Sequence, residues 1–122
     1  MISYEEEPDI LSIHVRGSLT GQDMITVVRT SYPRLQGRAV LWNLAHGDML
    51  QLEDEDFDRL THAVAALPDT HLPRRTACFA PNPASFVRFC TYMTHALKAE
   101  IPVQYCTFSD LCRAQEWLRS GR

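Results

Sequence analysis

The chain has 122 residues, of which 45% are hydrophobic and 22% are charged, and its formal net charge is −3. These values are ordinary for a globular protein, so we expect residues 1–122 to form a single domain with a normal core. No window approaches the roughly 18 apolar residues of a membrane-spanning helix, and the acidic N-terminus lacks the pattern of an export signal. We therefore expect a cytoplasmic protein without stable membrane insertion.

Charge is spread unevenly along the chain. Residues 1–73 carry five Arg and twelve Asp or Glu, a net of −7, whereas residues 74–122 carry seven Lys or Arg and three Asp or Glu, a net of +4. Basic residues do not cluster with aromatic ones, which argues against nucleic acid as a partner. The asymmetry is typical of solvated faces on different helices, and self-association or a charged partner is the alternative.

The first third of the chain predicts a hairpin followed by a helix. Apolar and polar residues alternate in "ILSIHVRG" (10–17), as in a half-buried strand, and residues 1–6 are its expected hairpin partner. The stretch "TGQD" (20–23) has the spacing of a capping box that starts a helix. Because proline cannot continue a helix, we expect this one to end or bend near Tyr32, before Pro33. Its expected core residues are Met24, Val27, Val28 and Leu35.

The middle third predicts a central strand, a loop and a second helix. The stretch "RAVLWNL" (38–44) is almost continuously apolar, as in a strand covered on both faces. We expect a polar loop at His46, Gly47 and Asp48 to follow. The next helix has an apolar face of helical period and acids crowded into its first turn, where they complement the helix dipole. The apolar residues are Phe57, Leu60, Val64 and Leu67, and the acids are Glu53, Asp54, Glu55, Asp56 and Asp58.

The last third continues the alternation of strand and helix. The stretches "RTACFA" (75–80) and "VQYCTF" (103–108) predict two buried strands. Asn82 is the expected N-cap of the helix after the first, and Ser109 is the expected N-cap of the helix after the second. The expected core residues of these two helices are Phe86, Phe89, Cys90, Met93, Leu97, Leu111, Ala114 and Leu118.

The order of elements is therefore β-β-α-β-α-β-α-β-α. It predicts an α/β fold with a single-layer, largely parallel sheet, an N-terminal antiparallel hairpin and about four helices. Over nearly the whole chain this order resembles a STAS-type domain of the SpoIIAA-like branch. The end of the chain carries most of the resemblance, because the family's last helix typically follows a phenylalanine and an acidic turn and contains a leucine, an alanine and a Trp-Leu pair. The matching residues are Phe108, Asp110, Leu111, Ala114, Trp117 and Leu118.

The resemblance implies a bacterial regulatory protein and indicates where its site would lie. In the anti-sigma-factor antagonists of the family, the third strand ends in an aspartate, and a phosphorylatable Ser or Thr opens the second helix. Asn43 occupies the strand-end position here, but residues 44–60 contain no Ser, Thr or Tyr. Acids from Glu53 to Asp56 stand where the phosphoacceptor would be. The chain thus resembles the less characterised SpoIIAA-like relatives.

Two kinds of binding site follow from this reading. We expect a contact surface for a protein partner or a second copy of the chain, formed by Asn43, His46, Asp48, Glu53, Asp54 and Asp56. Ligands of open parallel sheets tend to bind beyond the carboxyl ends of the strands, so Asn82 and Ser109 are candidates for an anionic ligand. An apolar ligand is the other form of this alternative, although aromatic residues at helical spacing are more often core. Its candidate lining is Phe86, Phe89, Tyr92 and Met93.

Signs of catalysis or metal binding are weak. His46 and Asp48 could form an acid–base pair or two metal ligands, but a polar turn at Gly47 is the simpler interpretation. The four cysteines match no zinc pattern and are expected to be reduced. His62 and His95 are expected to be solvated. We therefore expect neither an enzyme nor a metal or other cofactor.

The predicted function is a non-enzymatic regulatory or protein-interaction module that lacks the usual phosphoacceptor. The alternative is a domain that binds a small ligand at the carboxyl ends of the strands. An enzyme that uses His46 and Asp48 is the third hypothesis.

Overall fold

One mixed sheet organises the chain in the computed structural model, which describes residues 1–120. Its five strands lie in the order β1-β2-β3-β4-β5, with β1 antiparallel to β2 and the other neighbours parallel. The strands are β1 (Ile2–Glu6), β2 (Ile10–Ser18), β3 (Ala39–Asp48), β4 (Arg75–Phe79) and β5 (Gln104–Phe108). The structure confirms the predicted α/β fold with its N-terminal antiparallel hairpin. The domain prediction of 1–122 includes residues 121–122, which lie outside the described residues.

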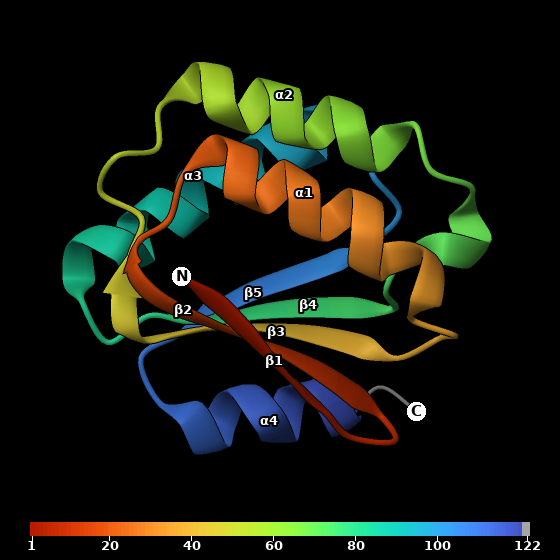
Figure 1. Ribbon diagram of the computed structural model, residues 1–122, viewed down its shortest axis with the longest axis horizontal. Helices are drawn as coiled ribbons and strands as arrows, with labels where there is room; N and C mark the ends of the chain where they lie inside the picture. Colours follow the sequence, from red (N-terminus) through yellow and green to blue (C-terminus); the bar gives the residue numbers. More distant parts are fainter. Residues whose placement is uncertain (121–122) are drawn as a thin grey trace.

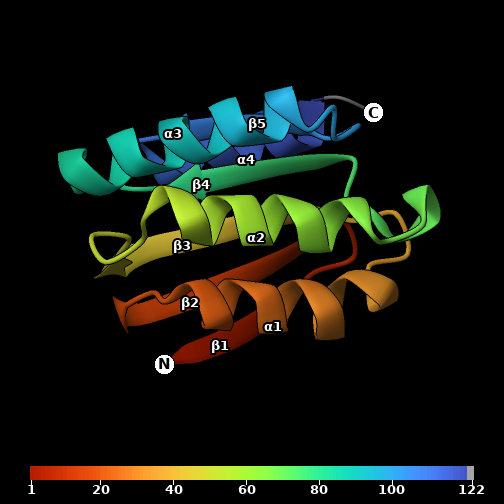
Figure 2. The same cartoon turned by 90° about the horizontal axis from the view of Figure 1, so that it is seen from above.

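Helices cover both faces of the sheet. Within residues 1–120 the α-helices are α1 (Gly21–Ser31), α2 (Asp54–Ala65), α3 (Pro83–Lys98) and α4 (Leu111–Ser120), with short 3-10 turns η1 (Tyr32–Arg34) and η2 (Asp69–His71). Figure 1 shows α1, α2 and α3 on one face and α4 on the other. In Figure 2, α1, α2 and α3 lie next to one another in that order across the sheet. The sheet is thus a single layer between two helical layers.

Each helical layer encloses its own apolar core. The larger core lies under α1, α2 and α3 and contains the fully buried Ile13, Phe57 and Phe89. The smaller core lies under α4, where Leu118 packs with Leu41 and its neighbours. From Ala39 to Leu44, β3 is buried on both faces, as predicted for a central strand.

The first helix begins and ends as its sequence indicates. Thr20 Oγ1 accepts a hydrogen bond from the Asp23 N–H (3.1 Å), and the Asp23 carboxylate accepts one from the Thr20 N–H (3.3 Å). These two bonds complete the capping box. The helix ends at Ser31 and tightens into η1, because Pro33 has no N–H to continue it.

The predicted loop at His46, Gly47 and Asp48 is instead the end of β3. These three residues pair in parallel with residues 16–18 of β2. Backbone pairing therefore continues beyond Leu44, the last fully buried residue of the strand. The sequence pattern missed this extension because the periodicity of apolar residues indicates only which side chains are buried. The end of β3 has few buried side chains and is held by backbone hydrogen bonds to β2.

Two predictions about the last two helices are also wrong. Leu97 is 79% exposed, because it lies about 100° around α3 from the buried Ala96. The buried residues of α3 are Ser85, Phe89, Tyr92 and Ala96. The side chain that caps α4 is Asp110 and not Ser109, since Asp110 Oδ1 accepts a hydrogen bond from the Arg113 N–H (3.1 Å).

Candidate functional site

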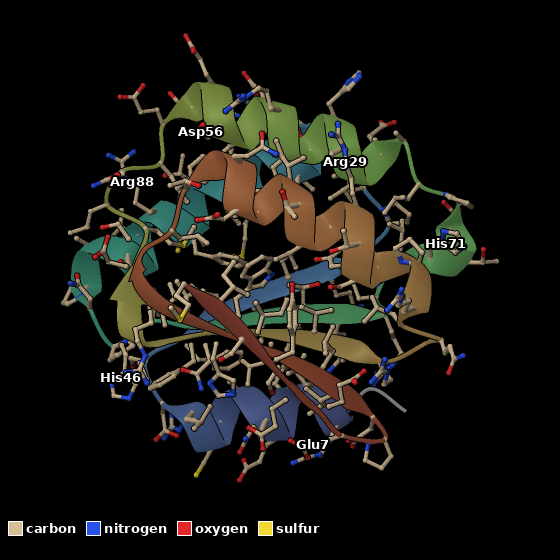
Figure 3. All side chains as sticks on the ribbon, in the orientation of Figure 1. Glu7, Arg29, His46, Asp56, His71 and Arg88 are labelled. Atoms are coloured by element: carbon tan, nitrogen blue, oxygen red, sulfur yellow. The ribbon has the colours of Figure 1, made fainter. Side chains whose placement is uncertain are left out.

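The residues of the predicted contact surface lie on opposite sides of the sheet. Glu53, Asp54 and Asp56 are at the start of α2, whereas Asn43 and His46 belong to the end of β3. Figure 3 shows Asp56 in the layer of α1, α2 and α3, and His46 on the side of α4. The fold therefore separates the predicted surface into two sites.

The start of α2 contains one carboxylate with a structural role. Asp56 Oδ2 accepts a hydrogen bond from the Glu53 N–H (2.9 Å), and Asp56 Oδ1 lies 2.8 Å from Arg59 Nη2. The backbone bond first, and then Arg59, lower the pKa of Asp56. Glu53, Asp54 and Glu55 are exposed, and we call these three residues the acidic surface.

His95 connects α3 to this acidic helix. Its Nδ1 lies 2.8 Å from Asp58 Oδ1, and its Nε2 lies 3.3 Å from Asp54 Oδ1. The ring also packs against Phe57, with ring centroids 5.7 Å apart. The prediction that His95 is solvated is therefore wrong, because α2 lies beside it, whereas His62 is exposed as expected.

A groove of about 430 Å³ lies between α1 and α2. Ile25 and Ala63, both less than a tenth exposed, line its apolar part. The polar residues that line it are Gln22, Arg29, Asp58, Arg59 and His62. Sequence reasoning missed the groove, because it arises from the packing of two helices whose relative position no local pattern gives.

A smaller pocket of about 140 Å³ lies over β1, β2 and the end of β3. It is lined by Ser3, His14, Val15, Arg16, Asn43 and His46. Because α4 packs mainly on β3, β4 and β5, the polar face of the hairpin remains available here. The signal in the sequence was the alternation that placed His14 and Arg16 on the polar face of β2.

Asp48 does not share this pocket with His46. Its carboxylate accepts hydrogen bonds from the Ser18 hydroxyl (3.1 and 3.2 Å) and from the Leu50 N–H (3.0 Å). These bonds fix the end of the β2–β3 pair. Within residues 1–120, Asp48 and His46 form no hydrogen bond or ion pair with each other. The structure therefore gives no support to the hypothesis that these two side chains act as an acid–base pair.

The predicted anion site involves two neighbouring strand ends. Asn82 Oδ1 accepts hydrogen bonds from the Ala84 N–H (2.9 Å) and the Ser85 N–H (3.4 Å), which confirms the predicted N-cap. Ser109 is exposed beyond the end of β5. The helices that follow them pack on opposite faces of the sheet, so the two residues lead into different layers (Figure 1). Anion binding at either residue stays a prediction.

The thiols are arranged as core residues more than as a reactive centre. Cys78 is buried, Cys90 and Cys106 are half-buried, and Cys112 is exposed. Burial raises the pKa of the Cys78 and Cys106 thiols, which favours the unreactive protonated form. Across residues 1–120, no three His, Cys, Asp or Glu side chains are grouped to hold a metal ion.

Crossing a lipid bilayer requires a helix that is both long and apolar. None of the helices within residues 1–120 has both properties to the degree needed to cross a membrane.

The chain is similar in structure to a protein of known fold. That protein is an uncharacterized member of the DUF3478 family from Shewanella loihica PV-4, and its crystal structure is described as having a SpoIIAA-like fold. The TM-score is 0.55, and the likeness covers 97% of this chain and 92% of that chain at 18% sequence identity. No family model and no curated protein matches the chain. The likeness shows that this chain has a SpoIIAA-like fold, as the resemblance in sequence implied.

Proposed function

We propose that the chain is a non-enzymatic regulatory or protein-interaction module and that α2 forms its contact surface. One observation supports this proposal above the others. The same helix presents the acidic surface at its start and, along its side, a groove with an apolar part formed by Ile25 and Ala63.

The acidic surface favours a partner with a basic surface. Leu50, which precedes it in the chain, is 47% exposed and adds an apolar contact. In the relatives with a phosphoswitch, a phosphate would bring negative charge to this position. Here the charge is fixed in the carboxylates of Glu53, Asp54 and Glu55, so the contact would not need phosphorylation.

The partner is either another protein or a second copy of the chain. Residues 74–122 carry a net charge of +4, from seven Lys or Arg and three Asp or Glu, so a second copy can supply complementary charge. Such complementarity mainly raises the rate and the specificity of association. The half-exposed Leu50 then supplies apolar surface that is removed from water on binding.

The test neutralises the acidic surface and keeps the hydrogen bond from the Glu53 N–H to Asp56 at the start of α2. The variant Glu53→Gln, Asp54→Asn, Glu55→Gln keeps Asp56, because Asp56 holds the Glu53 N–H. Its matched control, Asp69→Asn, Glu100→Gln, Glu116→Gln, removes the same charge from exposed positions elsewhere. Sedimentation velocity reports self-association, and quantitative cross-linking in the cells of origin reports partners.

We expect the first variant to lose the contacts that the control retains. Equal contacts in the wild type and in both variants would show that the acidic surface is not the contact surface.

A further inference from the structure

We propose that the pocket lined by Ser3, His14, Arg16, Asn43 and His46 binds a small oxyanion, such as phosphate or the phosphate group of a monoester. We call it the anion pocket. It is independent of the contact surface on α2, because the two lie on opposite faces of the sheet (Figure 3).

A β-bulge directs two side chains of β3 toward the pocket. His14 pairs with Asn43 and Arg16 pairs with His46, so two steps along β2 correspond to three steps along β3. In a regular strand, residues three apart point to opposite faces, because side chains alternate. The extra residue therefore places Asn43 and His46 on the same face, and bulges often re-aim side chains in this way beside binding sites.

Asn43 offers an oriented hydrogen-bond donor. Its side chain is nearly buried, with the residue 7% exposed, and its Oδ1 accepts a hydrogen bond from the Ala45 N–H (2.9 Å). That bond fixes which end of the amide is the acceptor, so the Nδ2 amino group is the end that remains to donate. Within residues 1–120, Nδ2 has no acceptor from the protein. Within residues 1–120, Nδ2 is not among the buried side-chain atoms that lack a partner, so it reaches solvent and can donate to water or to a bound oxyanion.

The other lining groups favour negative charge. Arg16 carries a permanent positive charge, and its guanidinium matches the geometry of a phosphate. His14 Nε2 lies 3.1 Å from Glu5 Oε1, which holds the ring in place, and Nδ1 has no hydrogen-bond partner within residues 1–120. A protonated imidazole donates from both nitrogens, and the Ser3 hydroxyl donates as well. The Glu5 side chain is 63% exposed, so water screens its repulsion of an anion.

The size of the pocket limits the ligand. A volume of about 140 Å³ is below the roughly 300–1,000 Å³ of sites for drug-sized molecules. It equals the space of about four or five water molecules at roughly 30 Å³ each. A tetrahedral oxyanion fits this space, and the organic part of a monoester would extend out of the pocket.

A wider hollow of about 540 Å³ is lined by Asp9, Arg38 and Arg74, and within residues 1–120 Arg74 Nη1 is buried there without a partner, but the Asp9 carboxylate disfavours an anion. The Arg38 guanidinium there already donates to Glu6 and to the backbone carbonyls of residues 34 and 35.

Inorganic phosphate is the first probe. In an NMR titration of ¹⁵N-labelled protein, we expect saturable shifts of the Asn43 side-chain amide and of the His14 and His46 imidazoles. Phenyl phosphate and sulfate are titrated in the same way as second and third probes. Tighter binding of phenyl phosphate would assign the pocket to a monoester, and tighter binding of phosphate or sulfate would assign it to a free ion.

Two variants test the residues that carry the inference. Arg16→Gln removes the fixed charge from an exposed position, and Asn43→Asp keeps the acceptor for the Ala45 N–H but replaces the donor with a carboxylate. Each should weaken phosphate binding by about tenfold or more, as for the loss of a charge-assisted hydrogen bond. Lys98→Gln, an equal change of charge at an exposed position on α3, should leave binding unchanged.

A Kd weaker than about 1 mM for every probe in the wild type would overturn the proposal. So would binding by Arg16→Gln that equals the wild type, because an exposed arginine can be replaced without loss of the fold.

Discussion

His95 on α3 is paired with Asp58 on α2 at 2.8 Å, although 37 positions separate them in sequence. The pair ties two helices together beside the acidic surface, and Asp54 of that surface also contacts the ring. The geometry of the proposed contact surface therefore depends on α3 as well as on α2.

Removing His95 should destabilise the fold modestly. His95→Ala loses both the pairing and the packing against Phe57, so we expect the free energy of unfolding to fall by about 1 kcal/mol. The Asp58 side chain is 70% exposed, so Asp58→Asn should cost about 0.2–1 kcal/mol. Urea unfolding of both single variants and the double variant gives the coupling energy. Strictly additive losses would show that the two side chains do not stabilise each other.

Asp56 should make stability depend on pH. Its pKa is lowered in the folded state, chiefly by the Glu53 N–H, so its ionised form stabilises the fold above the pKa of the unfolded chain. This contribution is lost as the pH falls through the lower, folded pKa. Asp56→Asn should therefore cost about 1 kcal/mol at pH 7, and the difference from wild type should shrink in acid.

Urea unfolding from pH 7 down into the acid range measures this effect. Glu55→Gln, a change at an exposed neighbour, serves as the control. A difference between wild type and Asp56→Asn that stays constant over the whole range would contradict the prediction.

Much of the fold could be predicted because local chemistry decides it. The hydroxyl and acid of Thr20 and Asp23 form a capping box in any context that permits a helix, and Pro33 ends that helix for lack of an N–H. The apolar run in β3 likewise follows from burial on both faces, whereas β2 is buried on both faces from Ile10 to Ile13 and shows the predicted polar face only at His14 and Arg16. These features need only residues that are close in sequence.

The features that were missed depend on neighbours that are distant in sequence. His95 is solvated on the pattern of α3 alone, and only the position of α2 makes it a bridge. Leu97 fits the helical period of Phe86, Cys90 and Met93, but the buried face of α3 runs through Ser85, Phe89, Tyr92 and Ala96. Asn43 and His46 were candidates from the start, yet nothing in the sequence indicates the bulge that places them on one face. The anion pocket therefore appears only in the assembled sheet.

The buried tyrosines should destabilise the protein in alkali. Burial raises the pKa of Tyr105 to about 12, and burial first and then the nearby Tyr105 raise the pKa of Tyr92 well above its ordinary value. The unfolded chain ionises near pH 10, so stability should fall as the pH rises from about 10 toward the folded pKa values. The absorbance of tyrosinate measures the tyrosine pKa values in the folded protein. Urea unfolding at a series of alkaline pH values measures the loss of stability.

Tyr105→Phe is the variant that isolates this effect. Because it removes the acceptor of the Tyr92 hydroxyl, which lies 3.0 Å away, it should cost about 1 kcal/mol at pH 7. Its loss of stability above pH 10 should be smaller than that of the wild type, since one ionisable phenol is gone. An equal alkaline loss in both proteins would assign the effect to other groups.

Gly47 should be required for the close approach of β2 and β3. A Cβ at this position would lie 2.6 Å from the Val15 carbonyl oxygen and 2.9 Å from that of Gly17, so the backbone would have to move. We expect Gly47→Ala to cost about 1–3 kcal/mol, as in other overpacked sites. Because Gly47 follows His46 directly, the shift should also weaken phosphate binding in the anion pocket.

Gly37→Ala separates this steric effect from the general cost of replacing a glycine. Gly37 has a φ of +83°, and a Cβ added there would meet no heavy atom within 4 Å, so alanine at this position is strained but not crowded. It should cost about 1–2 kcal/mol and leave phosphate binding unchanged, because it lies away from the pocket. If both variants lost phosphate binding equally, reduced stability alone would explain the loss. If only Gly47→Ala lost it, the close pairing of β2 and β3 would be what holds His46 in the anion pocket.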